Sequence, residues 1–369
     1  WETFAKDFIR PLIIIITGVG AVTGVGIWFT ISALAPRGTG NMLRVFFWPW
    51  FIEWLVFTAE VIVILIYYFL WDKWTERKKL AHIKLAFFYT FLAMMSGVLI
   101  TGILGFMLTS DGWPWDQSFW KAFFNPSFLP QLFVRFGLAF FLGSVFTISY
   151  LLFTKRDPDF KKEALKKFGL FGLISLSVWL LAAVWYFTVV PSTFKTHSVF
   201  SVLTGHFSQY TTIFWIVNIA AFLFLLIFAV MAFTGRIGIS KSFVIPAAIL
   251  AMLFVTEFER VREFIRGPYL MPGYMYANQI LLKETPMLEE KGTVVNSYWY
   301  NKLTDNKNVV SQGLYLFGKN CSVCHTIDGL NDIKARVKGR SRDGVFVIVR
   351  NSHRMVPFMP PFSGSKQEQ

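Results

Sequence analysis

The chain has 369 residues, of which 54% are hydrophobic and 18% aromatic, and it carries a formal net charge of +14. So apolar a composition excludes an ordinary soluble domain and is typical of a protein that lies in a bilayer. The positive charge does not indicate a nucleic-acid-binding protein, because the basic residues lie mostly in short loops between apolar runs and in the C-terminal segment.

Seven apolar runs are long enough, or nearly so, to span a membrane. Only helices or closed barrels satisfy the backbone in lipid, and these runs are too long for barrel strands. We therefore predict an all-α integral membrane bundle of about seven transmembrane helices over residues 1–266. The seventh run is the weakest, since it becomes charged after Thr256. The runs cover residues 11–35, 45–71, 85–110, 132–153, 168–191, 211–234 and 242–264.

Ionisable residues inside these runs are candidates for function, because a charge in lipid is costly. Glu53 and Glu60 lie seven residues apart in the second run, so they share one helix face two turns apart. One interpretation is a proton path or a carboxylate beside a haem. The other is a buried pair of acids neutralised by Arg135 of the fourth run or by an arginine at a helix end.

The seventh run ends in a charged stretch, residues 257–266, that begins with Glu257. One of its glutamates is a candidate for a haem or redox role, although the spacing also fits a helix end held by ion pairs between neighbouring turns. His197 and His206 precede the sixth run and are either ligands of a b-type haem or interfacial polar residues. His82 lies in the most basic loop and is expected at the surface.

Loop charge predicts the orientation, because cytoplasmic loops are enriched in Lys and Arg. Loops 71–84, 154–167 and 235–241 are basic, whereas the alternate loops 111–131 and 192–210 each hold a single lysine. We therefore predict a bacterial inner-membrane protein whose basic loops are cytoplasmic and whose residues 267–369 are periplasmic. Residues 267–310 form a connector along the outer face.

The run Cys321-Ser322-Val323-Cys324-His325 is a C-x-x-C-H motif, typical of covalent c-type haem attachment. The chain has two cysteines, and both lie in this motif. A disulfide would give no reason for the histidine, and a zinc site would need a second Cys/His cluster. The sequence therefore predicts one covalent haem c, with His325 as an iron ligand, in a small all-α cytochrome c domain over residues 311–369.

A methionine is the usual second iron ligand in electron-transfer c cytochromes. Met359, in Phe358-Met359-Pro360-Pro361, is the first candidate, since the prolines hold the loop extended and the loop resembles that of class I cytochromes c. Met355 and His353 are the alternatives. The domain is short, so we expect a partner subunit to cover part of the haem.

Several short segments stand in order over roughly residues 10–269. They are Val22-Thr23-Gly24, Ile52-Glu53-Trp54-Leu55, Trp71-Asp72-Lys73, Gly105-Phe106-Met107, Asn125-Pro126, Leu132-Phe133-Val134 and Glu263-Phe264-Ile265-Arg266-Gly267-Pro268-Tyr269. Together they resemble the larger subunit of cytochrome bd oxidases. The resemblance implies that Glu53 and Glu60 lie beside the oxygen-site haems and deliver protons, and that Glu257 ligates a high-spin haem.

The sequence departs from that family at its electron-input side. Arg135 and Val217 stand where the family has the histidine and methionine ligands of its low-spin haem, and the quinol-binding loop is reduced to a segment near residues 191–210. The family's first helix, which carries another haem histidine, also has no counterpart in this sequence.

Two functions fit these observations. The chain could be a membrane-bound cytochrome c subunit that transfers electrons between a periplasmic cytochrome or redox protein and a b- or d-type haem centre linked to oxygen or quinol. Alternatively, it is a haem c relay that anchors a larger respiratory assembly and has no catalytic centre of its own. Lipid and other membrane subunits are the expected partners in both cases, and nucleic acid is not.

Overall fold

The computed structural model describes residues 1–75, 78–110, 113, 118–197, 211–235, 241–297, 308–329 and 331–369. The chain forms two compact units. The bundle unit consists of Trp1–Phe106, Phe119–Val189 and Ile216–Thr256. The second unit consists of Met107–Ser118, Val190–Trp215 and Glu257–Gln369.

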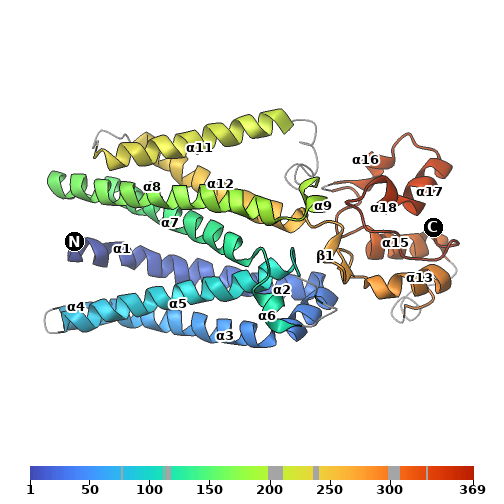
Figure 1. The fold of residues 1–369 in the computed structure, drawn as a ribbon, viewed down its shortest axis with the longest axis horizontal. Coiled ribbons are helices and arrows are strands. Elements are labelled where there is room, and N and C mark those ends of the chain that lie inside the picture. Colours follow the sequence, from blue (N-terminus) through green and yellow to red (C-terminus); the bar gives the residue numbers. More distant parts are fainter. Residues whose placement is uncertain are drawn as a thin grey trace. The chain divides into compact units, whose positions relative to one another are not determined.

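Long helices build the bundle unit (Figure 1). The first begins as α1, Glu2–Ile14, and continues through a π-helical stretch, Ile15–Gly20, into α2, Ala21–Leu34. The others are α3 (Pro36–Phe69), α4 (Trp71–Thr75), α5 (Lys79–Phe106), α6 (Phe119–Phe123), α7 (Phe128–Phe153), α8 (Pro158–Val189), α11 (Thr211–Phe233) and α12 (Lys241–Phe264), whose last turns belong to the second unit.

Six helical segments of the described chain are long and apolar enough to cross a membrane. They correspond to the first six predicted runs. Most of these helices extend past the apolar residues into the predicted polar loops, because the backbone hydrogen bonds of a helix do not depend on apolar side chains. The seventh run also forms a helix, α12, but does not reach the same apolar character because of its charged end. The prediction of an all-α membrane bundle is confirmed, with six strong spans instead of seven.

Glycines allow several of these helices to approach closely, as small residues do in membrane bundles. A β-carbon on Gly137 of α7 would lie 2.7 Å from the backbone nitrogen of Trp179 on α8. One on Gly169 of α8 would overlap the backbone of Phe233 on α11. The largest apolar core lies among α7, α8, α11 and α12 and includes Phe141, Leu165, Phe228 and Ala247.

Described residues of two basic loops, 71–84 and 154–167, lie at the end of the bundle unit where α1 begins. Lys6 of α1 binds Asp72 at 2.6 Å, and Lys79 binds Glu2. Arg156 binds Asp7. The ammonium of Lys167 lies 4.7 Å from the Trp1 ring, and Lys166 approaches Gly235. The described residues of loops 71–84 and 154–167 therefore lie near the start of α1, whereas residues 236–240 of the third basic loop lie outside the described residues.

The second unit combines the outer connector with short helices. It contains α9 (Ser192–Lys195) and an antiparallel hairpin of β1, Tyr269–Met271, and β2, Met275–Tyr276. A 3-10 turn, Leu282–Glu284, leads into α13, Thr285–Lys291. The C-terminal helices are α15 (Val309–Asn320), α16 (Ile333–Val337), α17 (Arg342–Arg350) and α18 (Ser352–Met355).

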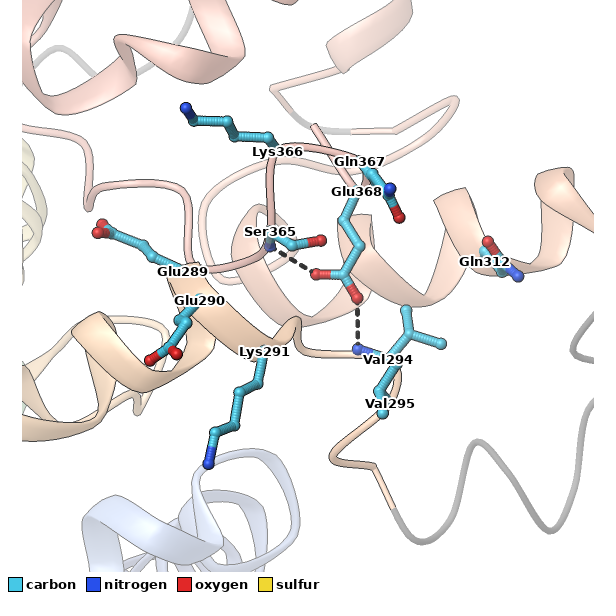
Figure 2. A pocket seen from close by; sticks show the side chains of 10 residues that line it. All are labelled: Glu289, Glu290, Lys291, Val294, Val295, Gln312, Ser365, Lys366, Gln367 and Glu368. Atoms are coloured by element: carbon cyan, nitrogen blue, oxygen red, sulfur yellow. Dashed lines mark hydrogen bonds between the residues drawn. The ribbon is translucent and has the colours of Figure 1, made fainter.

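Glu368, near the C-terminal end, forms hydrogen bonds with the connector. Its carboxylate accepts hydrogen bonds from the backbone nitrogens of Thr293, Val294 and Ser365, each at 2.8 Å. Figure 2 shows the bonds from Val294 and Ser365, at the edge of an open cavity of about 530 Å³. Leu316 of α15 also packs with Val294 in a small apolar cluster. The connector is therefore part of the C-terminal fold.

Candidate functional site

The C-x-x-C-H motif follows directly from the end of α15. Asn308 caps the start of this helix, accepting from the backbone nitrogens of Val310 and Ser311, and Cys321 ends it. Both cysteines are free thiols of intermediate exposure in the structure. Burial raises the pKa of Cys321 to about 11, with a further contribution from Cys324, and burial raises the pKa of Cys324 as well.

His325 is oriented by the loop that follows it. Its Nδ1 donates to the backbone carbonyl of Asn331 at 3.3 Å, so Nε2 is the ring nitrogen that stays available to a metal. Burial lowers the pKa of His325, favouring the neutral ring that a metal needs. Asn331 has a left-handed backbone with φ of 56°. Its side chain donates to the carbonyl of Cys324 and accepts from Arg336 Nε at 2.7 Å.

The candidate methionine loop is tied to the same motif. Asn320, directly before Cys321, accepts from the backbone nitrogen of Ser363 at 2.8 Å and donates to its carbonyl at 3.3 Å. Ser363 follows Met359 by four residues. His353 Nδ1 donates to the carbonyl of Met359 at 2.7 Å. The structure thus brings the two predicted iron-ligand segments to the same end of α15.

The choice among the three candidate second ligands follows from their settings. Met355 is 56% exposed, whereas Met359 is partly buried in a loop held at both sides. The Nδ1 of His353 is engaged by the Met359 carbonyl. Met359 stays the first candidate for the second ligand, and His353 holds its loop through the Met359 carbonyl.

The residues present fit a covalently bound haem. Two free thiols, an oriented imidazole and a neighbouring thioether are the donor set of a c-type site with His and Met axial ligands. Val323 and Ile327, inside and just after the motif, are 50% and 43% exposed, as expected of side chains that a porphyrin would cover. Among the described residues no group of three His, Cys, Asp or Glu is placed to hold a bare metal ion.

Glu53 and Glu60 lie on a polar seam between α3 and α5, which run side by side (Figure 1). Ser96 of α5 donates to Glu53 at 3.0 Å, and Tyr89 is hydrogen-bonded to Glu60. Glu60 follows Glu53 by seven residues on α3, whereas its partner Tyr89 precedes Ser96 by seven residues on α5. This reversed order is what two antiparallel helices require. Both carboxylates therefore have neutral hydrogen-bond partners on α5, which the sequence did not reveal.

His82 of α5 and Tyr67 of α3 form the next polar pair between these two helices, seven residues beyond Tyr89 and Glu60. The His82 ring stacks on Tyr67 with centroids 4.1 Å apart, and its Nε2 donates to the Tyr67 carbonyl at 3.0 Å. The residue is 6% exposed. The expectation that His82 is a surface residue was wrong, because α5 begins at Lys79, before the apolar run, and carries the ring against α3.

The charged end of α12 lies in the second unit. Arg262 binds Glu259 at 2.9 Å, and Arg266 binds Glu263; both pairs are spaced i,i+3. These two glutamates therefore form the ion pairs between neighbouring turns that the spacing predicts. Glu257 is partly buried and takes part in no ion pair within the described part of the chain.

His197 contacts the methionine loop of the second unit. Its Nδ1 donates to the carbonyl of Ile265 at 3.3 Å, and its ring meets the Phe358 ring edge-on at 5.5 Å between centroids. A β-carbon on Gly267 would also meet Phe358, at 2.7 Å. The segment around Met359 is thus anchored at the end of α12. His206 lies outside the described residues.

The comparison with known families agrees with the bundle. The sequence model described as cytochrome bd terminal oxidase subunit I matches residues 1–189, just over half of the chain. The chain belongs to this family. It is therefore a multi-pass membrane protein of respiratory electron transport, in a family whose members bind b- and d-type haems. No curated protein and no solved structure gives a significant match.

Some of the candidate residues lie inside the range that the family model matches, and others lie beyond it. Glu53 and Glu60 lie inside the matched residues, whereas Glu257, Val217 and the whole second unit's C-terminal part lie beyond them. Val217 on α11 is 57% exposed, and Arg135 on α7 is partly buried. The family membership therefore bears on the membrane bundle. The haem prediction for the C-terminal segment depends on the C-x-x-C-H motif and on the contacts around it.

Proposed function

We propose that this subunit I relative transfers single electrons through a covalently attached haem c in its C-terminal segment. Cys321 and Cys324 would carry the thioether bonds, and His325 and Met359 would ligate the iron. The electrons would pass between a soluble periplasmic carrier and a redox centre in the membrane bundle. The observation that carries this proposal is the meeting of the C-x-x-C-H motif and the Met359 loop through Asn320 and Ser363.

The bound haem would supply a one-electron redox couple. The chain's own residues hold it in a defined setting: Asn331 orients the His325 ring, and His353 and Ser352 hold the Met359 loop through its carbonyl groups. A thioether ligand raises the reduction potential of such a couple. Burial of the cysteines limits contact of the attachment site with water.

Protons that accompany the electrons would move along the seam between α3 and α5. Glu60 and Glu53 are the groups there that exchange protons most readily, and the hydroxyls of Tyr89 and Ser96 donate to them. In this proposal the carboxylates take up protons from the end of the bundle where the basic loops meet. Glu257 is a further candidate, on the resemblance alone.

The second function, a haem c relay without a catalytic centre of its own, is favoured by Arg135 and Val217. Neither side chain replaces the axial ligands that the resemblance calls for. A pyridine haemochrome spectrum of the purified chain separates the two functions. Haem c together with b- or d-type bands supports electron transfer into the bundle, whereas haem c alone supports the relay and anchor.

Cys321→Ala tests the attachment site itself. Because each thioether needs its own sulfur, we expect loss of normal covalent attachment and of most haem staining on a denaturing gel. Ser322→Ala is the matched control, since the Ser322 hydroxyl only donates to the Gly318 carbonyl at 2.6 Å. Undiminished staining of the Cys321 variant would count against haem c at this site.

A further inference from the structure

A strongly basic strip follows the candidate haem motif. Lys334, Arg336, Lys338, Arg340 and Arg342 occupy alternate positions of nine residues, from α16 to the first residue of α17, and all are exposed. Of these five basic residues, all of which lie in the described part of the chain, only Lys334 is ion-paired, with Asp328. A run of charges is often merely a solvated surface, so further observations are needed to assign it a function.

The first observation is the link between the strip and the haem motif. Arg336 donates to the Asn331 side chain, which in turn donates to the Cys324 carbonyl, and the Asn331 carbonyl accepts from His325. A single residue, Asn331, thus connects Arg336 of the strip with His325, the predicted haem ligand. A protein that docks on it would come close to the haem, as electron transfer requires.

The second observation is an apolar centre beside the charges. Arg342, Phe346 and Arg350 are spaced four residues apart on α17, so they lie on one face, and all are exposed. Phe346, Val345 and Val349 line a shallow cavity of about 470 Å³ that is flanked by Arg342 and Lys366. An apolar centre with a charged rim is the usual anatomy of a protein–protein interface.

The third observation concerns the acidic residues nearby. Glu368 follows Lys366 closely, but its carboxylate is turned inward and held by three backbone nitrogens, while Lys366 extends away from it (Figure 2). The exposed acids nearby are Asp343, at the start of α17, and Glu289 and Glu290, which line the neighbouring cavity together with Lys366. With five basic residues (Lys338, Arg340, Arg342, Arg350 and Lys366) against these three acids, the surface keeps a net positive charge.

We propose that Lys338, Arg340, Arg342, Phe346, Arg350 and Lys366 form the docking surface for an acidic one-electron carrier protein. This inference rests on the proposed haem c function. Opposite charges would steer the carrier toward the haem and raise the association rate, as they do in other electrostatically complementary pairs. An anionic membrane surface would also bind basic residues, but it would not need them beside the haem ligand.

The experiment uses the detergent-solubilised full chain and plastocyanin, an acidic copper protein. In the direction tested, the reduced chain loses one electron and the oxidised copper gains it, with no bond formed between the proteins. The second-order rate is measured by stopped flow at low ionic strength, where screening is weak, and again near 1 M salt, where charges act over only about 3 Å.

The test variant is Arg340→Glu with Arg342→Glu. We expect its rate with plastocyanin to fall about tenfold or more at low salt, and to approach the original rate at high salt. The control is Lys283→Glu with Lys84→Glu, which makes the same charge change on exposed residues outside the proposed surface and should lower the rate less than about twofold. A basic soluble cytochrome c should react faster with the test variant than with the original chain.

Three outcomes would overturn the docking surface. Equal rate losses in the two variants would show a general charge effect, and unchanged rates would show no effect. Unchanged rates together with lost binding to phosphatidylglycerol vesicles would assign the strip to lipid. Each applies only when the original chain stains for covalent haem; an unstained chain would instead overturn the proposed function, and the docking surface with it.

Discussion

Asn331 is the residue that connects most of the groups around the candidate haem motif. It bonds to His325 and Cys324 with its carbonyl and amide, and its left-handed backbone lets the chain turn back at this point. Asparagine tolerates this conformation better than most residues, although less easily than glycine. Its role could not be predicted from the sequence, because it depends on a bond to a ring six residues away.

Replacing Asn331 separates the backbone requirement from the side-chain bonds. Asn331→Ala loses both the side-chain bonds and the tolerance for positive φ, whereas Asn331→Gly loses only the bonds. We expect the alanine variant to be less stable than the glycine variant by about 1–2 kcal/mol. Denaturant titration followed by the haem absorption measures the difference; equal midpoints would show that the backbone conformation is not the limiting factor.

Met359 and Met355 offer a matched pair for the second iron ligand. Because Met359 lies in the loop held by His353, Met359→Ala should remove the sulfur–iron absorption near the red end of the spectrum and lower the reduction potential. Met355→Ala should leave both unchanged. If the absorption disappears in the Met355 variant instead, the ligand assignment is wrong.

At the scale of whole elements, the helix pair α3 and α5 carries the proposed proton path. Their antiparallel contact places three polar pairs at seven-residue intervals, Glu53 with Ser96, Glu60 with Tyr89 and Tyr67 with His82. A polar seam in a bundle of apolar helices has a cost in lipid. We therefore interpret it as functional, in agreement with the family's respiratory role.

Glu60→Gln tests the seam. Glutamine keeps the shape and a hydrogen bond to Tyr89 but cannot release a proton, so we expect proton uptake linked to electron transfer to slow about 100-fold. Thr58→Ala is the control, since this exposed hydroxyl only donates to the Trp54 carbonyl of its own helix. Uptake is measured with a pH-sensitive dye in vesicles; equal rates in both variants would contradict a proton role for Glu60.

At the scale of the whole molecule, the basic loops predict the orientation. Loops 71–84 and 154–167 lie near the start of α1, and the positive-inside tendency then predicts a periplasmic C-terminal segment. This is the side on which c-type haem is attached in bacteria. Both signals therefore predict that the candidate haem site lies outside the cytoplasm.

Thiol labelling of intact cells with the outer membrane removed tests this orientation. Lys283→Cys in the connector should react with a membrane-impermeant maleimide, whereas Lys162→Cys in the basic loop should react only after the membrane is opened. Both positions are exposed. The reverse pattern would place the C-terminal segment in the cytoplasm and remove the basis for covalent haem attachment there.

Several properties of this protein follow from the order of residues alone. The lengths of the apolar runs determined the helical membrane class, and the spacing of Cys321, Cys324 and His325 determined the candidate haem site, because both are local in the chain. The tertiary structure decided which side chains meet: Ser96 and Tyr89 with the glutamates, Ser363 with Asn320, and His82 with Tyr67. Those pairs depend on helix register and loop return, which arise from packing between distant segments.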